Sequence, residues 1–72
     1  MNVELLCDMA NDIGAFFAAE PEHEAAVNGI ANHIRRFWEP RMRRQIVELL
    51  AGGAAHLDPL VREAVQRIAQ DS

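Results

Sequence analysis

The sequence predicts an all-α domain, a small bundle or orthogonal array of three to four short helices. Apolar residues recur at helical spacing in successive stretches of the chain. Proline at positions 21, 40 and 59 and the pair Gly52–Gly53 separate those stretches. No run of β-branched residues is long enough to predict a strand. A length of 72 residues fits a single domain over residues 1–72.

The first helix is predicted from Val3 to about Ala19. Its expected inward stripe comprises Leu6, Met9, Ala10, Ile13, Phe16 and Phe17, and Leu5 adjoins it. Cys7 lies one position off this stripe and is expected to be a small buried or half-buried residue. Gly14 inside a helix costs roughly 1 kcal/mol relative to alanine. Its presence therefore predicts a close crossing with another helix.

The second helix is predicted to begin at Pro21, because proline disfavours helix in the preceding residue and is well tolerated at the first helical position. Glu22 and Glu24 then lie in the first turn, where the helix dipole favours anions. The helix is expected to run to Phe37 or Trp38. Its expected inner side comprises Val27, Ile30, Ala31, Ile34, Phe37 and Trp38.

Glu39–Pro40 repeats this signal and predicts a third helix from Pro40 to Gly52–Gly53. Its apolar stripe comprises Met42, Ile46, Leu49 and Leu50. Residues 54–57 are expected to form a loop. Asp58 as an N-cap acceptor and Pro59 at the first position predict a fourth helix that ends near Ala69. Its apolar face comprises Leu60, Val61, Ala64, Val65 and Ile68.

Charge is distributed unevenly along the chain, although the net charge is only −4. The first 24 residues contain acidic but no basic side chains, and five of the seven basic residues lie between positions 35 and 44. Aromatic residues beside clustered arginine are typical of protein interfaces. We therefore expect a partner-binding surface made of Arg35, Arg36, Phe37, Trp38, Arg41, Met42, Arg43 and Arg44.

Within this segment the roles differ. Arg43 and Arg44, beyond the proline, are expected to be available for carboxylates of a partner. Arg35 and Arg41 are expected to be the ones that pair with Glu39 or with acids of the first helix. For Phe37 and Trp38, core packing and interface contact remain equally open.

The sequence contains no pattern that predicts a catalytic, cofactor-binding or metal site. Glu20-Pro21-Glu22-His23 has the Glu-x-x-His spacing of di-iron bundles, but a second such motif is missing and Glu20 is expected to cap a helix. The single cysteine excludes an internal disulfide and a cysteine-based zinc site. Asp8 and Asp12 lie one helical turn apart and are expected to form a solvated acidic face. No phosphate-binding glycine motif is present.

The alternative class is a small helical DNA-binding or regulatory protein that uses the basic cluster of residues 35–44. The acidic net charge and the absence of lysine are unfavourable for contacts with a phosphate backbone. No apolar stretch approaches the roughly 20 residues of a membrane span, and no secretory signal is visible. We therefore expect a cytoplasmic protein that binds neither nucleic acid nor membrane.

Three segments resemble the delta subunit of the NAD-dependent formate dehydrogenase complex. These are residues 9–17 (MANDIGAFF), 31–43 (ANHIRRFWEPRMR) and 57–62 (LDPLVR). The resemblance extends from about Leu5 to Val65.

The resemblance implies a non-catalytic accessory subunit of a cytoplasmic bacterial enzyme. In that complex the large alpha subunit oxidises formate at a molybdenum or tungsten pterin, and electrons pass through iron–sulfur clusters and FMN to NAD. The resemblance places no cofactor in this chain. It implies that the chain docks on the alpha subunit and supports assembly or stability of the complex. Self-association of the isolated chain stays open.

Overall fold

Helices account for most of the chain in the computed structural model, which describes residues 2–53 and 56–71. In order along the chain they are α1 (Val3–Phe17), α2 (His23–Phe37), α3 (Pro40–Ala51) and α4 (Pro59–Gln70). Helices and turns are the only structure within the described ranges. The predicted all-α fold is confirmed.

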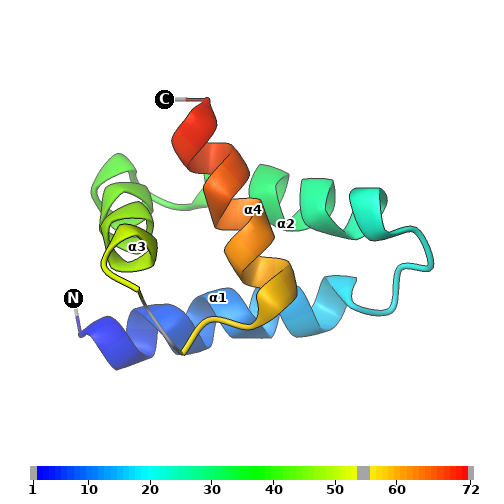
Figure 1. Ribbon diagram of the computed structural model, residues 1–72, viewed down its shortest axis with the longest axis horizontal. Coiled ribbons are helices and arrows are strands. Elements are labelled where there is room, and N and C mark those ends of the chain that lie inside the picture. The colour runs from blue at the N-terminus through cyan, green and yellow to red at the C-terminus, as the bar shows by residue number, and fades with distance from the viewer. Residues whose placement is uncertain (1, 54–55, 72) are drawn as a thin grey trace.

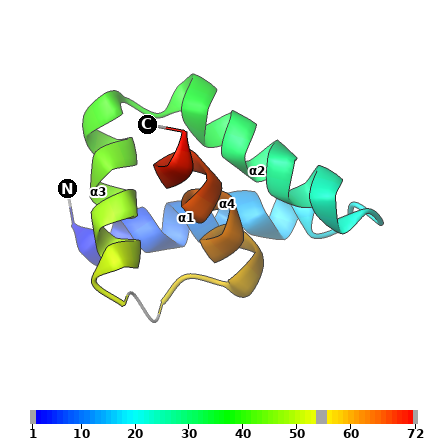
Figure 2. The ribbon, with the colours of Figure 1, turned by 45° about the horizontal axis from the view of Figure 1, so that its top comes forward.

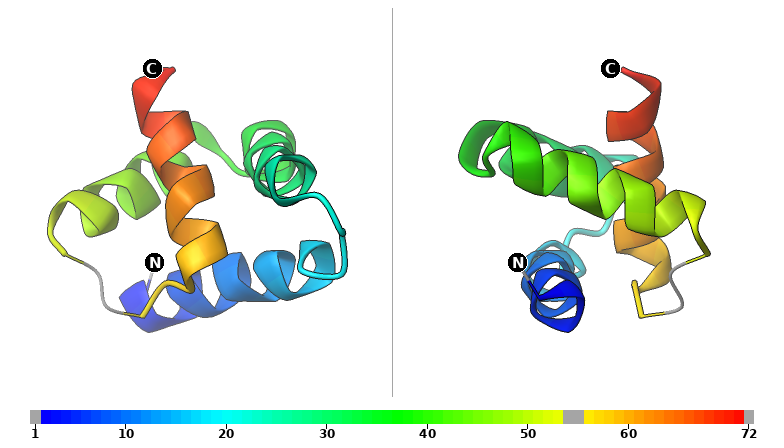
Figure 3. Two further views of the ribbon diagram at one scale, coloured as in Figure 1. Left: turned by 45° about the vertical axis from the view of Figure 1, so that its right-hand side comes forward. Right: turned by 90° about the vertical axis from the view of Figure 1, so that its left-hand side faces the viewer.

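The helices α1, α2 and α3 form a triangular frame, and α4 crosses it (Figures 1 and 2). Two further views show α4 standing across the other helices (Figure 3). Helix α4 packs against each of the other three. An amphipathic helix in this position has three neighbours against which to bury its apolar face.

The core is made of apolar residues from all four helices. Its largest fully buried side chains are Leu6, Ile30, Ile34, Ile46, Val27, Val61, Val65 and Cys7. Cys7 is therefore a core residue, as expected. Burial, followed by the nearby charge of Asp8, raises the pKa of its thiol above the ordinary value.

Gly14 on α1 lies directly against Val61 on α4. A Cβ atom placed on Gly14 would lie 2.4 Å from Cγ2 of Val61 and 3.9 Å from Cδ1 of Ile30. No carbon pair tolerates the first of these distances. The predicted helix crossing at Gly14 is confirmed.

The boundary between α1 and α2 differs from the prediction. Helix α1 ends at Phe17 rather than Ala19, because the N–H of Glu20 donates to the carbonyl of Phe17 at 3.0 Å and closes a tight turn. Helix α2 begins at His23 rather than Pro21. Glu22 is extended, and its carbonyl accepts the first helical bond, from Ala26 at 3.0 Å. Pro21 therefore lies in the turn before the helix.

Helix α4 begins where expected, but not through the expected cap. Asp58 is the N-cap residue, with Pro59 in the first turn, yet its carboxylate accepts no capping hydrogen bond. Instead, the side chain of Asn11 on α1 holds this segment. Its Oδ1 accepts from the N–H of Asp58 at 2.9 Å, and its Nδ2 donates to the carbonyl of His56 at 2.7 Å. Of the expected loop at residues 54–57, positions 54 and 55 lie outside the described residues.

Candidate partner-binding surface

The segment expected to bind a partner forms the corner between α2 and α3. Trp38 and Glu39 are both extended, with φ/ψ of −88°/140° and −63°/151°, and Pro40 opens α3. Two extended residues followed by proline end one helix and redirect the chain into the next. The side chains of residues 35–44 therefore point in several directions instead of along one helix face.

Trp38 points inward. Its side chain is 6% exposed and belongs to the core cluster, and Met42 is half-buried against the same cluster. The choice between core and interface is thereby decided for Trp38, which is a core residue. Phe37, expected on the inner side of the second helix, is 69% exposed. That expectation is wrong, because Trp38 occupies the core at this end of α2.

Arg43 is also engaged within the chain. Its Nη1 donates to the carbonyls of Arg35 at 3.0 Å and Trp38 at 2.9 Å. The last carbonyls of a helix lack helical partners and attract cations. Arg43 is therefore not the free cation that was expected, because Nη1 of its guanidinium caps the C-terminus of α2.

Arg35 pairs with a different residue from those expected. Its guanidinium forms an ion pair with Asp71, the residue that follows α4, and donates to Oδ1 of Asn32 at 3.4 Å. Neither Glu39 nor an acid of the first helix is its partner. The pair fastens α2 to the C-terminal end of α4.

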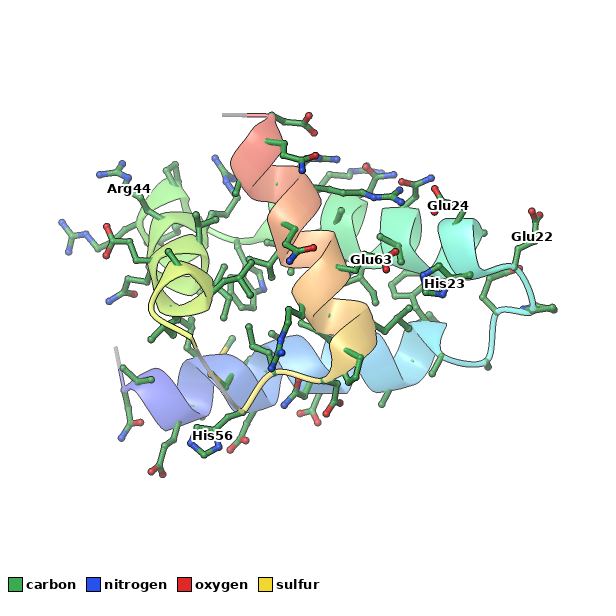
Figure 4. The ribbon with its side chains drawn as sticks, viewed as in Figure 1. Glu22, His23, Glu24, Arg44, His56 and Glu63 are labelled. Carbon is green, nitrogen blue, oxygen red and sulfur yellow. The ribbon has the colours of Figure 1, made fainter. Side chains whose placement is uncertain are left out.

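The residues that remain available form what we call the basic corner: Arg36, Phe37, Arg41 and Arg44. All four side chains are exposed, and none of the three arginines forms an ion pair with another described residue. The guanidinium of Arg36 lies 5.9 Å from the ring centre of Phe37. Arg44 projects outward from α3 (Figure 4). The basic corner thus presents an aromatic ring and three cations that form no ion pair within residues 2–53 and 56–71.

A second polar cluster ties α2 to α4. Nε2 of His23 lies 2.7 Å from Oε2 of Glu63, and the two side chains face each other in Figure 4. Arg67 donates to Oε1 of Glu24 at 2.7 Å and to Oδ1 of Asn28 at 2.8 Å. The hydrogen bond from Arg67 lowers the pKa of Glu24 and raises that of Arg67. Each group in this cluster has a partner in the chain, so its role is structural.

Metal-ligating side chains do not gather in the described part of the chain: no group of three among His, Cys, Asp and Glu is placed to hold an ion. Glu20 of the Glu-x-x-His motif is exposed, and its carboxylate accepts from the N–H of Glu22 at 3.5 Å. Cys7 is buried in the core. Iron–sulfur clusters require several thiolates, so these residues do not fit one.

None of the described helices combines the length and apolar character that crossing a bilayer requires.

The family model for the NADH-dependent formate dehydrogenase delta subunit, FdsD, matches residues 5–65. The chain belongs to this family. The match covers α1 from Leu5, all of α2 and α3, and α4 as far as Val65, and it includes the whole basic corner. Neither a curated protein nor a solved structure matches the chain significantly.

In this delta-subunit chain, sequence reasoning missed part of the exposed aromatic surface. Phe16 was expected in the inward stripe of the first helix but is 76% exposed. A signal for this was present, because adjacent residues on a helix point roughly 100° apart and Phe16 and Phe17 cannot both face the core directly. Leu5, at 52% exposure, also lies outside the core.

Proposed function

We propose that this chain is a non-catalytic accessory subunit of a cytoplasmic NAD-dependent formate dehydrogenase. It docks on the large catalytic subunit and supports assembly or stability of the complex. The molybdenum or tungsten pterin, the iron–sulfur clusters, FMN and NAD belong to the other subunits. Membership of the delta-subunit family supports this role.

One observation carries the docking proposal. Arg35, Arg43 and Arg67 have partners within the chain, while the three arginines of the basic corner are exposed and one of them, Arg36, lies over the exposed ring of Phe37. Arginine and aromatic residues are enriched where proteins bind one another. Planar guanidinium groups pair well with carboxylates, so the basic corner fits an acidic patch on the large subunit.

The test measures binding of the purified chain to the large subunit, with Arg41→Gln/Arg44→Gln as the variant. Exposed ion pairs contribute about 0.2–1 kcal/mol each, so losing two should weaken binding about two- to thirty-fold and reduce its salt dependence. The matched control is Ala19→Glu/Gln66→Glu, which changes the net charge equally at exposed positions outside the corner. This control should bind like the wild type.

Two results would contradict the proposal. If the wild-type chain does not bind the large subunit, the docking role is wrong. If the chain alone reduces NAD with formate, it is not an accessory subunit. Wild-type affinity in the double glutamine variant would show that docking uses another surface.

A further inference from the structure

An apolar groove lies between α1 and α2, and none of its lining residues belongs to the basic corner. It has a volume of about 320 Å³ and is lined by Asp12, Ile13, Phe16, Phe17 and His33. We call it the aromatic groove. The rings of Phe16 and Phe17 meet edge to face, with centres 5.1 Å apart.

Phe17 and Phe16 have different roles in the groove. Phe17 packs onto α2 so closely that a Cβ atom on Gly29 would lie 2.5 Å from its Cε1 atom. It forms a fixed floor. Phe16, at 76% exposure, forms a wall that nothing in the described part of the chain covers. The exposed ring of Phe16 beside the packed ring of Phe17 is suited to contact an apolar side chain of another molecule.

The groove is on the side of α1 that α4 does not cover. Helix α4 meets α1 at Gly14, where Val61 approaches. Residues two positions apart on a helix point in nearly opposite directions, so Phe16 faces away from this contact. The packing of α4 therefore leaves the aromatic groove open.

The aromatic groove continues into the basic corner. The ring of His33, which lines the groove, lies 4.8 Å from the ring of Phe37, and Arg36 lies over Phe37. The combined surface joins the apolar lining of the groove, which also includes Asp12, to the cation of Arg36 beyond Phe37. An occupant of matching charge has an apolar stripe with a carboxylate near Arg36.

A second copy of this chain is a poorer occupant. A stable interface covers about 800 Å² on each partner, which is about a sixth of the 4624 Å² of this molecule's surface. The few side chains of the groove cannot supply that area by themselves. A segment of a larger protein that also contacts the basic corner can supply it.

We infer that the aromatic groove binds an amphipathic segment of the large catalytic subunit, with apolar side chains against Phe16 and Phe17 and a carboxylate paired with Arg36. This inference rests on the proposed docking function. It assigns Phe16 as the anchor of the interface. The arginines of the basic corner then orient the segment and contribute less affinity.

The decisive variant is Phe16→Ser, assayed for binding to the purified large subunit. Removal of a central aromatic anchor weakens binding about 30-fold or more. Because Phe16 is exposed, the helical circular dichroism and melting temperature should remain close to those of the wild type. Leu5→Ser is the matched control, since Leu5 is an exposed apolar residue on α1 outside the groove. It should bind within about threefold of the wild type.

A photoreactive benzoylphenylalanine at position 16 identifies the occupant. It should cross-link to a segment of the large subunit that carries both apolar and acidic residues, whereas the same group at the exposed position Gln66 on α4 should not. Cross-linking to a second copy of the chain would overturn the inference. So would wild-type affinity of Phe16→Ser in an assay where the wild-type chain binds. Failure of the wild-type chain to bind would instead contradict the proposed function.

Discussion

The guanidinium of Arg43 donates to the carbonyl of Trp38 across the corner between α2 and α3, at 2.9 Å. The same nitrogen donates to the carbonyl of Arg35. A side chain from the first turn of one helix thus satisfies the end of the preceding helix. This contact fixes the corner from which the exposed arginines project.

Arg43→Ala should destabilise the domain. Hydrogen bonds to a charged group contribute about 1.5–3 kcal/mol, and the two carbonyls would lose their partner. Thermal unfolding followed by circular dichroism measures the loss. Arg44→Ala, one position along, should change stability by no more than about 0.5 kcal/mol because Arg44 is exposed and unpaired among the described residues. Equal stability of the two variants would contradict the capping role of Arg43.

Trp38→Ala should destabilise the domain strongly, whereas Phe37→Ala, at the neighbouring position, should have little effect on stability. Trp38 is 6% exposed and Phe37 69% exposed. Truncation of a buried aromatic residue costs about 3–5 kcal/mol, which is enough to unfold so small a domain. Phe37→Ala should leave the melting temperature nearly unchanged. Chemical denaturation of both variants provides the comparison, and a folded Trp38→Ala domain of wild-type stability would contradict the packing described.

Gly14→Ala should destabilise the crossing of α1 and α4. The added methyl group would meet Cγ2 of Val61, and overpacking of this kind costs about 1–3 kcal/mol. The better helix propensity of alanine offsets roughly 1 kcal/mol of this loss of stability. Val61→Ala removes the opposing methyl groups. A double-mutant cycle in denaturant should therefore show that the Gly14→Ala/Val61→Ala variant loses less stability than the sum of the single variants; strict additivity would contradict the clash.

Acid should weaken the tie between α2 and α4. The hydrogen bond from Arg67 lowers the pKa of Glu24 in the folded state, so the folded state binds fewer protons at this carboxylate than the unfolded state. The stabilisation is present above the ordinary glutamate pKa of about 4.3 and is lost as the pH falls through the lowered folded value. Glu24→Gln should therefore flatten the acid side of the curve of melting temperature against pH.

The control for this titration is Glu48→Gln on α3. Glu48 is exposed and forms no ion pair among the described residues. Its variant should keep the wild-type curve. An unchanged curve for Glu24→Gln would show that the hydrogen bond from Arg67 does not contribute to stability in solution.

The features that could be predicted from the sequence are local ones. Pro40 and Pro59 open helices because proline suits the first helical turn, and Gly14 marks a crossing because an interior glycine is costly otherwise. The start of α2 was misplaced, because Pro21 is also compatible with the turn before a helix. Such choices depend on where the preceding helix ends.

The site residues were harder to predict, because their roles depend on the relative placement of the helices. Spacing along a helix puts Phe16 and Phe37 near the apolar stripe, but exposure depends on which neighbour covers that edge. Likewise, composition shows that arginines cluster, whereas only the corner geometry shows that Arg43 turns back to a carbonyl. The clamp formed by Asn11 joins residues more than 40 positions apart and leaves no local pattern.

The crossing position of α4 has a consequence for biosynthesis. The three helices that α4 packs against precede it in the chain and are synthesised first. Until Val61 and Val65 arrive, the side chains of Ile30 and Ile46 have water where the finished protein has apolar neighbours. The core is therefore incomplete until α4 has been made, and a chain without α4 exposes apolar surface that favours aggregation.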